Sequence, residues 1–380
     1  MHIAYLTPEY PHARINNGGG MGTSIENLVK ALVKNNQQVS VFVYGSRRSE
    51  VFTDGGITFH LIAQKNYKVG GFYFYRKHIE QYINNNAQNI DILEAPDWTG
   101  ITAFMRLKLP LVIRFHGSDT YFCHIEKRKQ KLKNKWFEML AVRKAMAYIA
   151  PTYFAGEKSM ELFKLPKEKL KVIHYGLELE NFNNNHPEEF EKYRVLNIGT
   201  LIRKKGVFQL IETFNKLVEI EPKSTLVFIG ADSVDIHTGS DSTWELMQNK
   251  MTDKAALSIT YLGKIPYELV QEQIKKAHVC VFPSLAETLG MVTIESMALQ
   301  KAVVNTNIGW AQDLIEHGVN GFMHHPDDID AYVASIKELF EDLNLTIKLG
   351  QAGRVKTEDK FDIQKIVYQN LELYKSISSL

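Results

Sequence analysis

The chain has 380 residues, more than one hydrophobic core usually supports, so we expect two domains. Hydrophobic residues make up 44% and charged residues 23% of the sequence, as in ordinary globular proteins. A formal net charge of +2 lacks the strongly basic balance typical of nucleic-acid-binding proteins, so we expect no nucleic-acid partner.

In the first half of the chain, short apolar segments alternate with amphipathic ones. A glycine-rich loop and a predicted helix over 24–36 follow the first strand, and a crossover helix is predicted over 98–108. The predicted strands cover residues 2–6, 38–44, 91–95, 110–116, 147–151 and 170–176. Strands that alternate with helices indicate a parallel sheet covered on both faces.

Residues 176–193 are polar, rich in asparagine and weakly periodic, which predicts a linker. The α/β pattern then restarts, with predicted helices over 207–220, over 268–277 and from about Met291. The second set of predicted strands covers residues 194–200, 224–230, 257–263, 278–283 and 301–306. We therefore predict two doubly wound, Rossmann-like α/β domains, residues 1–183 and 184–360.

Neither a disulfide framework nor a membrane segment is predicted. Cys123 and Cys280 match no metal-binding spacing and are typical of a reducing compartment. The start, MHIAYLTPEY, has too short an apolar stretch for a signal peptide, and no run approaches membrane-spanning length. We expect a cytoplasmic protein.

Two glutamates eight positions apart frame a predicted strand–loop–helix junction in the stretch AETLGMVTIES. Glu287 precedes the predicted helix start near Gly290, and Glu295 lies about one turn inside the helix. Backbone amides in a first helical turn lack intrahelical acceptors and bind anions such as a diphosphate. The order carboxylate, amides, carboxylate matches the order sugar, phosphates, ribose in a nucleotide sugar.

This segment resembles the glutamate-x7-glutamate motif of the retaining family-four glycosyltransferases (glycosyl transferases group 1), and the resemblance extends over essentially the whole chain. It implies the GT-B fold, two facing Rossmann-like domains with a cleft between them, and a terminal helix, 361–380, that packs back on the first domain. It also implies that Glu287 contacts the transferred sugar, that Glu295 binds the ribose, and that the amides of Met291 and Val292 hold the diphosphate.

The stretch NIGTLIRKKG places a basic cluster between a predicted strand and a predicted helix. A basic loop can be a solvated turn, but cations facing a diphosphate stabilise the charge that grows on a leaving group. The resemblance places Lys205 on the phosphate-binding lysine and Lys204 just before it. Thr200 stands where the family has arginine, and Arg203 is our candidate for the missing phosphate contact.

Further candidates follow other predicted strands. The stretch NNGGGMGTSIENL, residues 16–28, resembles a family loop whose paired glycines, here Gly19 and Gly20, border the donor phosphates and the acceptor pocket. Taken alone, a glycine loop often only turns the chain. In YLGKIPYE, the backbone near Ile265 and Lys264 resembles the loop that reads the base, and Gly230 resembles a glycine beneath the nucleotide.

His116 ends a predicted strand in VIRFHGSD and resembles the family histidine that lies against the transferred sugar. Read alone, it is a structural histidine as readily as a catalytic one. Asp119 follows it in the same loop, where it could meet the acceptor or orient His116.

Residues 124–144 contain eight basic and two acidic residues, with Trp136 and Phe137 among them. This composition fits a solvated helix face, and it also fits peripheral contact with anionic lipid at the inner face of a membrane.

We therefore predict a retaining, metal-independent glycosyltransferase that moves a sugar from a UDP- or GDP-sugar to a hydroxyl acceptor, either free or lipid-linked, without a further cofactor. A role in polysaccharide, glycolipid or glycoconjugate synthesis follows from the resemblance. No evident enzymic nucleophile is found, so we expect front-face transfer with Glu287, His116 and Lys205 as the catalytic residues. Two alternatives stay open: another GT-B enzyme, such as a sugar-nucleotide epimerase or a phosphorylase, and a non-catalytic partner protein that keeps the fold.

Overall fold

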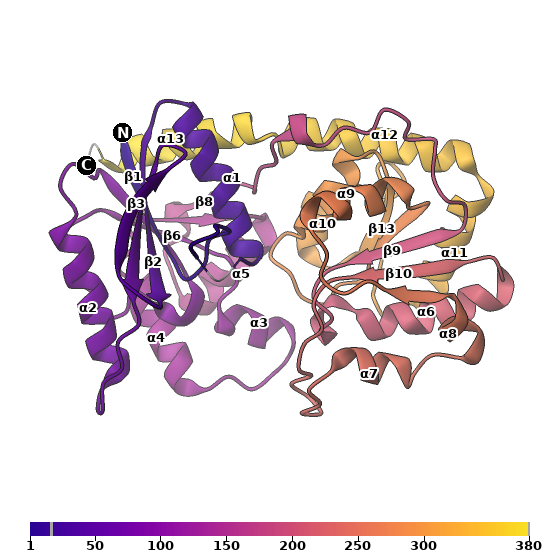
Figure 1. Ribbon diagram of the computed structural model, residues 1–380, viewed down its shortest axis with the longest axis horizontal. Helices are drawn as coiled ribbons and strands as arrows, with labels where there is room; N and C mark the ends of the chain where they lie inside the picture. Colours follow the sequence, from indigo (N-terminus) through magenta and orange to yellow (C-terminus); the bar gives the residue numbers. More distant parts are fainter. Residues whose placement is uncertain (16–17, 379–380) are drawn as a thin grey trace. The chain divides into compact units, whose positions relative to one another are not determined.

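The computed structural model describes residues 1–15 and 18–378, so Asn16 and Asn17 of the glycine-rich loop lie outside the described residues. The chain divides into two compact units. Unit 1 contains Met1–Glu178 together with Asp362–Leu380, and unit 2 contains Leu179–Phe361. Figure 1 colours both units along the sequence.

Unit 1 is built on a sheet of eight strands in the order β3-β4-β2-β1-β5-β6-β7-β8 among the described residues. All neighbouring strands are parallel except β3 and β4, which are antiparallel at the edge. The strands are β1 (His2–Thr7), β2 (Gln38–Ser46), β3 (Glu50–Asp54), β4 (Ile57–Ala63), β5 (Ile92–Pro96), β6 (Leu111–Arg114), β7 (Ala147–Ala150) and β8 (Leu170–Val172). Strands buried on both faces explain the nearly continuous apolar runs of β1 and β2.

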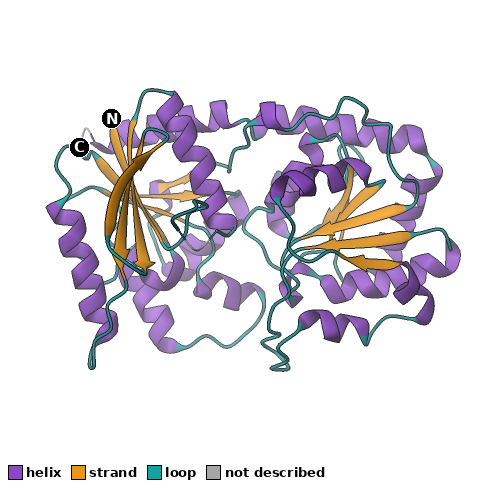
Figure 2. Ribbon diagram, viewed as in Figure 1, coloured by secondary structure: helices purple, strands orange, loops and turns teal. Residues whose placement is uncertain are grey.

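Helices cover both faces of this sheet (Figure 2). The helices of unit 1 are α1 (Gly20–Lys34), α2 (Gly71–Asn85), α3 (Asp119–Ile125), α4 (Leu132–Val142), α5 (Tyr153–Phe163) and α13 (Ile363–Ser378). One face packs against α1 and α13, with Leu32 and Val367 fully buried, and the other packs against α2 and α5.

A buried polar network joins the terminal helix α13 to the sheet. Arg114 donates from Nε and Nη2 to the two carboxylate oxygens of Glu94, at 2.7 and 2.9 Å. The Tyr374 hydroxyl donates to Glu94 Oε2 at 2.6 Å, and Asn370 Oδ1 accepts from Arg114. These partners satisfy a charge pair that would be costly if left alone in the core.

Unit 2 is built on a parallel sheet of six strands in the order β11-β10-β9-β12-β13-β14 among the described residues. Its strands are β9 (Arg194–Ile198), β10 (Thr225–Ile229), β11 (Ile259–Tyr261), β12 (Val279–Phe282), β13 (Ala302–Thr306) and β14 (Phe322–His324). Its helices are α6 (Val207–Ile220), α7 (Thr243–Gln248), α8 (Asp253–Ser258), α9 (Tyr267–Lys276), α10 (Met291–Ala298), α11 (Ile329–Glu341) and α12 (Leu343–Lys360). The predicted fold class is confirmed in both units, because each is a Rossmann-like, mainly parallel α/β sheet.

The helix predicted over 98–108 is wrong. Only a short 3-10 turn, η1 (Trp98–Gly100), forms there, and β5 continues to its neighbour β6 through irregular chain. Thr99, Gly100 and Phe104 all have positive φ values, which a right-handed helix does not accept. Gly100 also lies so close to the Phe137 backbone that a Cβ atom would come within 2.5 Å of it.

Among the described residues, no helix is both long and apolar enough to cross a membrane.

Candidate functional site

The phosphate-binding candidates of unit 2 lie on two loops whose backbones touch. The turn η4 (Arg203–Lys205) follows β9, and its Lys204 carbonyl accepts from the amides of Leu285 and Ala286, at 2.7 and 3.2 Å. Gly206 has φ 69°, and a Cβ atom there would lie 1.9 Å from the Pro283 carbonyl oxygen. Only glycine permits this approach, so Gly206 holds the basic loop against the loop that carries Glu287.

Lys205 and Glu287 form an ion pair between their Nζ and Oε1 atoms. Both side chains keep some exposure, 22% for Lys205 and 15% for Glu287. The sequence predicted that both residues contact one ligand, and the structure brings the two side chains together.

The start of α10 offers backbone amides without a side-chain cap. Gly290 is its N-cap residue with φ 96° and ψ 70°, and no side chain caps the helix there. The first-turn amides of Met291 and Val292 have no acceptor within their own helix, which makes this end suited to an anion. The helix start predicted from the sequence at about Met291 is confirmed.

Glu295 lies inside α10 and is 6% exposed. The hydroxyl of Tyr267, at the start of α9, donates to its Oε1 at 2.8 Å. Burial raises the pKa of Glu295 to about 7, and the hydrogen bond from Tyr267 opposes that rise. Tyr267 was not predicted from the sequence, although its position directly after the Ile265–Pro266 loop was a usable signal.

Arg203 is already engaged within unit 2. Its guanidinium forms a two-pronged ion pair with Asp235 and lies 4.5 Å from the centre of the Phe208 ring. This pair uses Nε and Nη2 of Arg203, and its role as a phosphate contact stays a prediction. Ile265 is partly exposed just before Pro266, the N-cap residue of α9, and its role as a base contact also stays a prediction.

In unit 1, His116 follows β6 and is held from two sides. Its amide donates to Asp97 Oδ1 at 2.9 Å, and its Nδ1 shares a 2.8 Å hydrogen bond with the Tyr175 hydroxyl. Burial lowers the pKa of His116 to about 3, so the imidazole is neutral at physiological pH. Asp97 and Tyr175 each follow a strand end, which was the available signal for finding them.

Asp97 is a buried carboxyl group with unused hydrogen-bonding capacity. Its Oδ2 atom has no hydrogen-bond partner within the described residues. Burial raises the pKa of Asp97 to about 7, although the His116 amide opposes that rise.

Asp119 begins α3 and contacts its own neighbours rather than His116. Its carboxylate accepts from Cys123, Arg128 and Asn134, at 3.2 to 3.3 Å. Burial tends to raise the pKa of Asp119, but these partners lower it overall. Of the two roles considered from the sequence, orientation of His116 has no support among these contacts.

Gly19 and Gly20 lie at the start of α1, where a carboxylate of the same unit already sits. Glu9 Oε1 accepts from the Gly22 amide at 2.7 Å. A Cβ atom on Gly19 would lie 2.8 Å from Glu9 Oε2, whereas Gly20 has open space around it. The contact of Gly19 and Gly20 with the donor phosphates stays a prediction.

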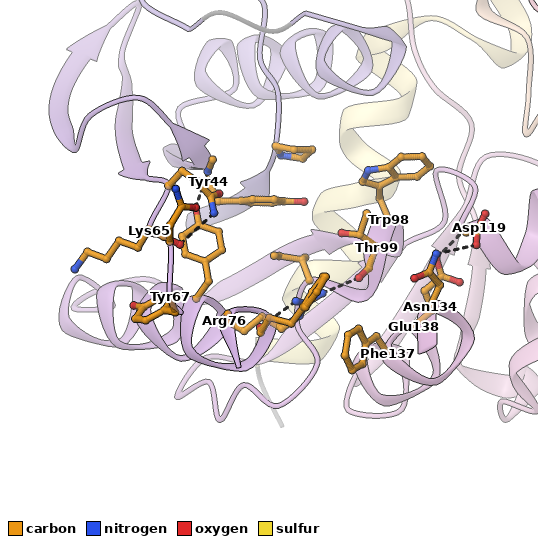
Figure 3. A pocket seen from close by; sticks show the side chains of 18 residues that line it. Tyr44, Lys65, Tyr67, Arg76, Trp98, Thr99, Asp119, Asn134, Phe137 and Glu138 are labelled. Carbon is orange, nitrogen blue, oxygen red and sulfur yellow. Dashed lines mark hydrogen bonds between the residues drawn. The ribbon is translucent and has the colours of Figure 1, made fainter. Parts of the chain in front are cut away.

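A cavity of about 1040 Å³ lies beyond strand ends in unit 1. Its lining includes aromatic rings, such as Tyr67, Trp98 and Phe137, and polar groups, such as Asp119. Figure 3 shows Arg76 reaching toward Thr99 and Asn134 reaching toward Asp119 within this lining. Aromatic surfaces with a few fixed polar groups are typical of small-molecule sites.

Comparisons with known proteins agree with this architecture. The sequence model "Glycosyl transferases group 1" matches residues 179–356, and the model "Glycosyltransferase Family 4" matches residues 18–181. An uncharacterised glycosyltransferase of Methanocaldococcus jannaschii is 22% identical over 99% of this chain and 98% of its own length.

Two solved structures show the same fold. Sucrose-phosphate synthase from Thermosynechococcus elongatus superposes with a TM-score of 0.81 at 17% identity, covering 100% of this chain and 99% of that one. Anabaena HepE in complex with UDP-glucose superposes with a TM-score of 0.77 at 19% identity, covering 99% of this chain and 100% of that one. The chain belongs to the group 1, family-four glycosyltransferases and has the GT-B fold.

Proposed function

We propose that this protein is a retaining glycosyltransferase that moves a sugar from a nucleotide diphosphate sugar to a hydroxyl acceptor. The observation that carries the proposal is the Lys205–Glu287 ion pair beside the uncapped start of α10. The ion pair and the helix start together supply a cation, a carboxylate and backbone amides that have no acceptor within the helix. All of them lie on adjoining loops of one unit.

Each group has a role in binding the donor. The Met291 and Val292 amides, with Lys205 and Lys204, would hold the diphosphate and stabilise the charge that develops as it leaves. Glu287 would accept hydrogen bonds from the sugar hydroxyls and fix the anomeric carbon in position. Glu295 would accept hydrogen bonds from the ribose, which requires its ionised form.

Retention follows from a front-face route in this proposal. The sugar–phosphate bond breaks as the acceptor oxygen bonds to the anomeric carbon on the same face, and the acceptor proton passes to the leaving phosphate. The enzyme then needs no nucleophile of its own. A neutral His116 would face the transferred sugar as a hydrogen-bonding group rather than as a cation.

We place the acceptor in unit 1, where Asp119 lines the cavity. The proposed setting is the cytoplasm, at the inner face of a membrane, in the synthesis of a polysaccharide, glycolipid or glycoconjugate. We also propose that transfer needs no metal. Loss of activity in a chelator, with recovery on addition of manganese, would refute metal independence.

A thermal-shift screen against UDP- and GDP-sugars tests donor binding first. UDP-glucose is the first compound to try, because the Anabaena relative was solved with it. A donor at 100 times its dissociation constant should add about 2.7 kcal/mol of stability. Glu287→Ala should lose most of this shift, whereas Glu341→Ala, an exposed control on α11, should keep it.

An acceptor screen with the identified donor then separates the alternatives. Transfer to an added hydroxyl compound supports the proposal. Conversion of the nucleotide sugar into its epimer without any acceptor would identify an epimerase, and tight donor binding without turnover across the screen would identify a non-catalytic protein.

A further inference from the structure

We propose that the starts of α2 and α4 form one docking surface for an anionic lipid membrane. We name this surface the aromatic–basic patch. Its apolar members are Tyr67, Val69, Phe72, Tyr73, Phe74, Leu132 and Trp136, and its basic members are Lys65, Lys68, Lys131, Lys133 and Lys135. It extends the expected contact through residues 124–144 to a second, unanticipated helix, and it does not depend on the donor site.

The segment 124–144 is not one continuous helix. Helix α3 ends at Ile125, an irregular stretch follows, and α4 starts at Leu132. The second half of α4 is committed to the core, since Ala141 and Val142 are fully buried. The patch takes in the stretch from about 127 to 136, in which every residue is exposed or partly exposed.

The rings of α2 and α4 form one connected surface. Phe104 bridges the two helices, because its ring centre lies 5.6 Å from that of Tyr73 and 5.6 Å from that of Trp136. Phe72 is 56% exposed and Trp136 is 53% exposed. Contiguous exposed apolar surface of this kind marks an interaction site, whereas single exposed hydrophobic residues are normal.

The two segments that carry these rings contain basic but no acidic residues. Residues 64–79 and 127–137 contain no aspartate or glutamate. The five lysines of the patch are exposed, and the Lys133 ammonium lies 3.3 Å from the centre of the Phe72 ring. A positive surface with apolar side chains at its centre complements anionic headgroups above an acyl layer.

The aliphatic members favour lipid over single-stranded nucleic acid. Stacked bases need aromatic or guanidinium planes, which Val69 and Leu132 do not provide. These two side chains are the most exposed apolar members of the patch, at 82% and 84%. Aliphatic groups of this exposure are suited to insertion between acyl chains, while the lysines extend toward the headgroups.

The patch also borders the cavity of unit 1. Tyr67 and Phe72 belong to both the patch and the cavity lining. A molecule anchored in the membrane could therefore reach the cavity without leaving the lipid surface.

Vesicle cosedimentation of the full chain tests the proposal. We expect binding to vesicles of equimolar phosphatidylcholine and phosphatidylglycerol, no binding to phosphatidylcholine alone, and weaker binding as salt increases. Absence of binding to the anionic vesicles at low salt would overturn the proposal, and so would equal binding to both kinds of vesicle.

Matched variants locate the binding surface. Replacing Lys131, Lys133 and Lys135 with glutamine should weaken binding roughly 100-fold, because each lysine near an anionic surface contributes a factor of about five. The same change at Lys167, Lys169 and Lys171, exposed residues near the start of β8, should have little effect. Equal effects of the two triple variants would contradict the assignment.

Insertion is tested with the apolar members. Phe72→Ser combined with Trp136→Ser should abolish vesicle binding, whereas Tyr368→Ser, on exposed α13 surface, should not. Melting temperatures identify any variant that is merely unfolded. Brominated lipids should quench the tryptophan fluorescence of the wild type more than that of a Trp136→Phe variant, which keeps the other tryptophans. Binding of a single-stranded RNA that the patch variants lose, with unchanged vesicle binding, would identify a nucleic-acid surface instead.

Discussion

The two units present their candidate site residues in different ways. In unit 2, Glu287, the α10 amides and Glu295 all come from one strand–loop–helix passage, and a single neighbouring loop adds Lys205. In unit 1, the cavity lining is drawn from many separate segments between Pro8 and Glu138. A site confined to one passage leaves a spacing pattern in the sequence, whereas a site gathered from many segments does not.

The two units also differ in how their polar groups are satisfied. Lys205 and Glu287 pair with each other at a partly exposed position, so a ligand can replace either partner. His116 and Asp119 are each held by several neighbours of their own unit. We therefore expect substitutions in unit 2 to change donor affinity and kcat. Comparable substitutions in unit 1 should mainly lower the free energy of unfolding.

The largest expected effect comes from Lys205→Ala. It removes the cation that we propose faces the leaving diphosphate, and loss of one such group costs roughly 10²–10³ in kcat. Steady-state kinetics with the identified donor measure it. Lys216→Ala, on the exposed surface of α6, is the matched control. A Lys205→Ala enzyme with wild-type kcat would remove Lys205 from the catalytic assignment.

Glu287→Ala should reduce kcat/KM about 100-fold, because it removes the carboxylate that we propose positions the anomeric carbon of the transferred sugar. The double variant Lys205→Ala, Glu287→Ala should lose less than the product of the two single losses, since the side chains contact each other. Strictly multiplicative losses would show that the two residues act on the donor independently.

Tyr374→Phe tests the scaffold of unit 1. It removes the 2.6 Å hydrogen bond to the buried carboxylate of Glu94, and we expect a loss of about 1–3 kcal/mol in the free energy of unfolding. Urea unfolding measures this, with Tyr368→Phe as the exposed control on the same helix. If both variants have the same free energy of unfolding, the network does not anchor α13.

The smallest expected effect is that of Tyr267→Phe on donor affinity. Burial raises the pKa of Glu295 to about 7, and we propose that the ribose binds its ionised form, so donor affinity should rise as pH increases through 7. Removing the Tyr267 hydrogen bond disfavours the ionised form further. The midpoint should move to higher pH by roughly half a unit to one unit, and affinity at pH 7 should fall about two- to fivefold.

Calorimetric titrations of donor between pH 5.5 and about 8.5 would show this midpoint, a range chosen to bracket the raised pKa. A purely structural role for Tyr267 would lower affinity equally at every pH. That result would contradict the proposed link between Tyr267 and Glu295.

Much of the fold could be predicted from the sequence, because buried parallel strands give nearly continuous apolar runs such as residues 38–44. The helix predicted over 98–108 failed because its apolar spacing came from packing around a turn with positive φ values at Thr99 and Phe104. The partly polar helix α2 was not predicted, since its first turn exposes Phe72, Tyr73 and Phe74 instead of burying them.

Part of the candidate site could be predicted from the sequence and part could not. The motif from Glu287 to Glu295 is local, so its spacing survives in the sequence. The partners of these residues are not local: Tyr267 is 28 positions from Glu295, and Tyr175 is 59 positions from His116. Asp235 likewise reaches Arg203 across 32 positions, and no spacing rule links such pairs in one sequence.

A crystal structure of the protein with a bound nucleotide sugar tests the central claim most directly. The account predicts the diphosphate on the amides of Met291 and Val292, the ribose at Glu295, and Glu287 turned from Lys205 to the sugar hydroxyls. A diphosphate bound elsewhere, with the Lys205–Glu287 pair still intact, would contradict it.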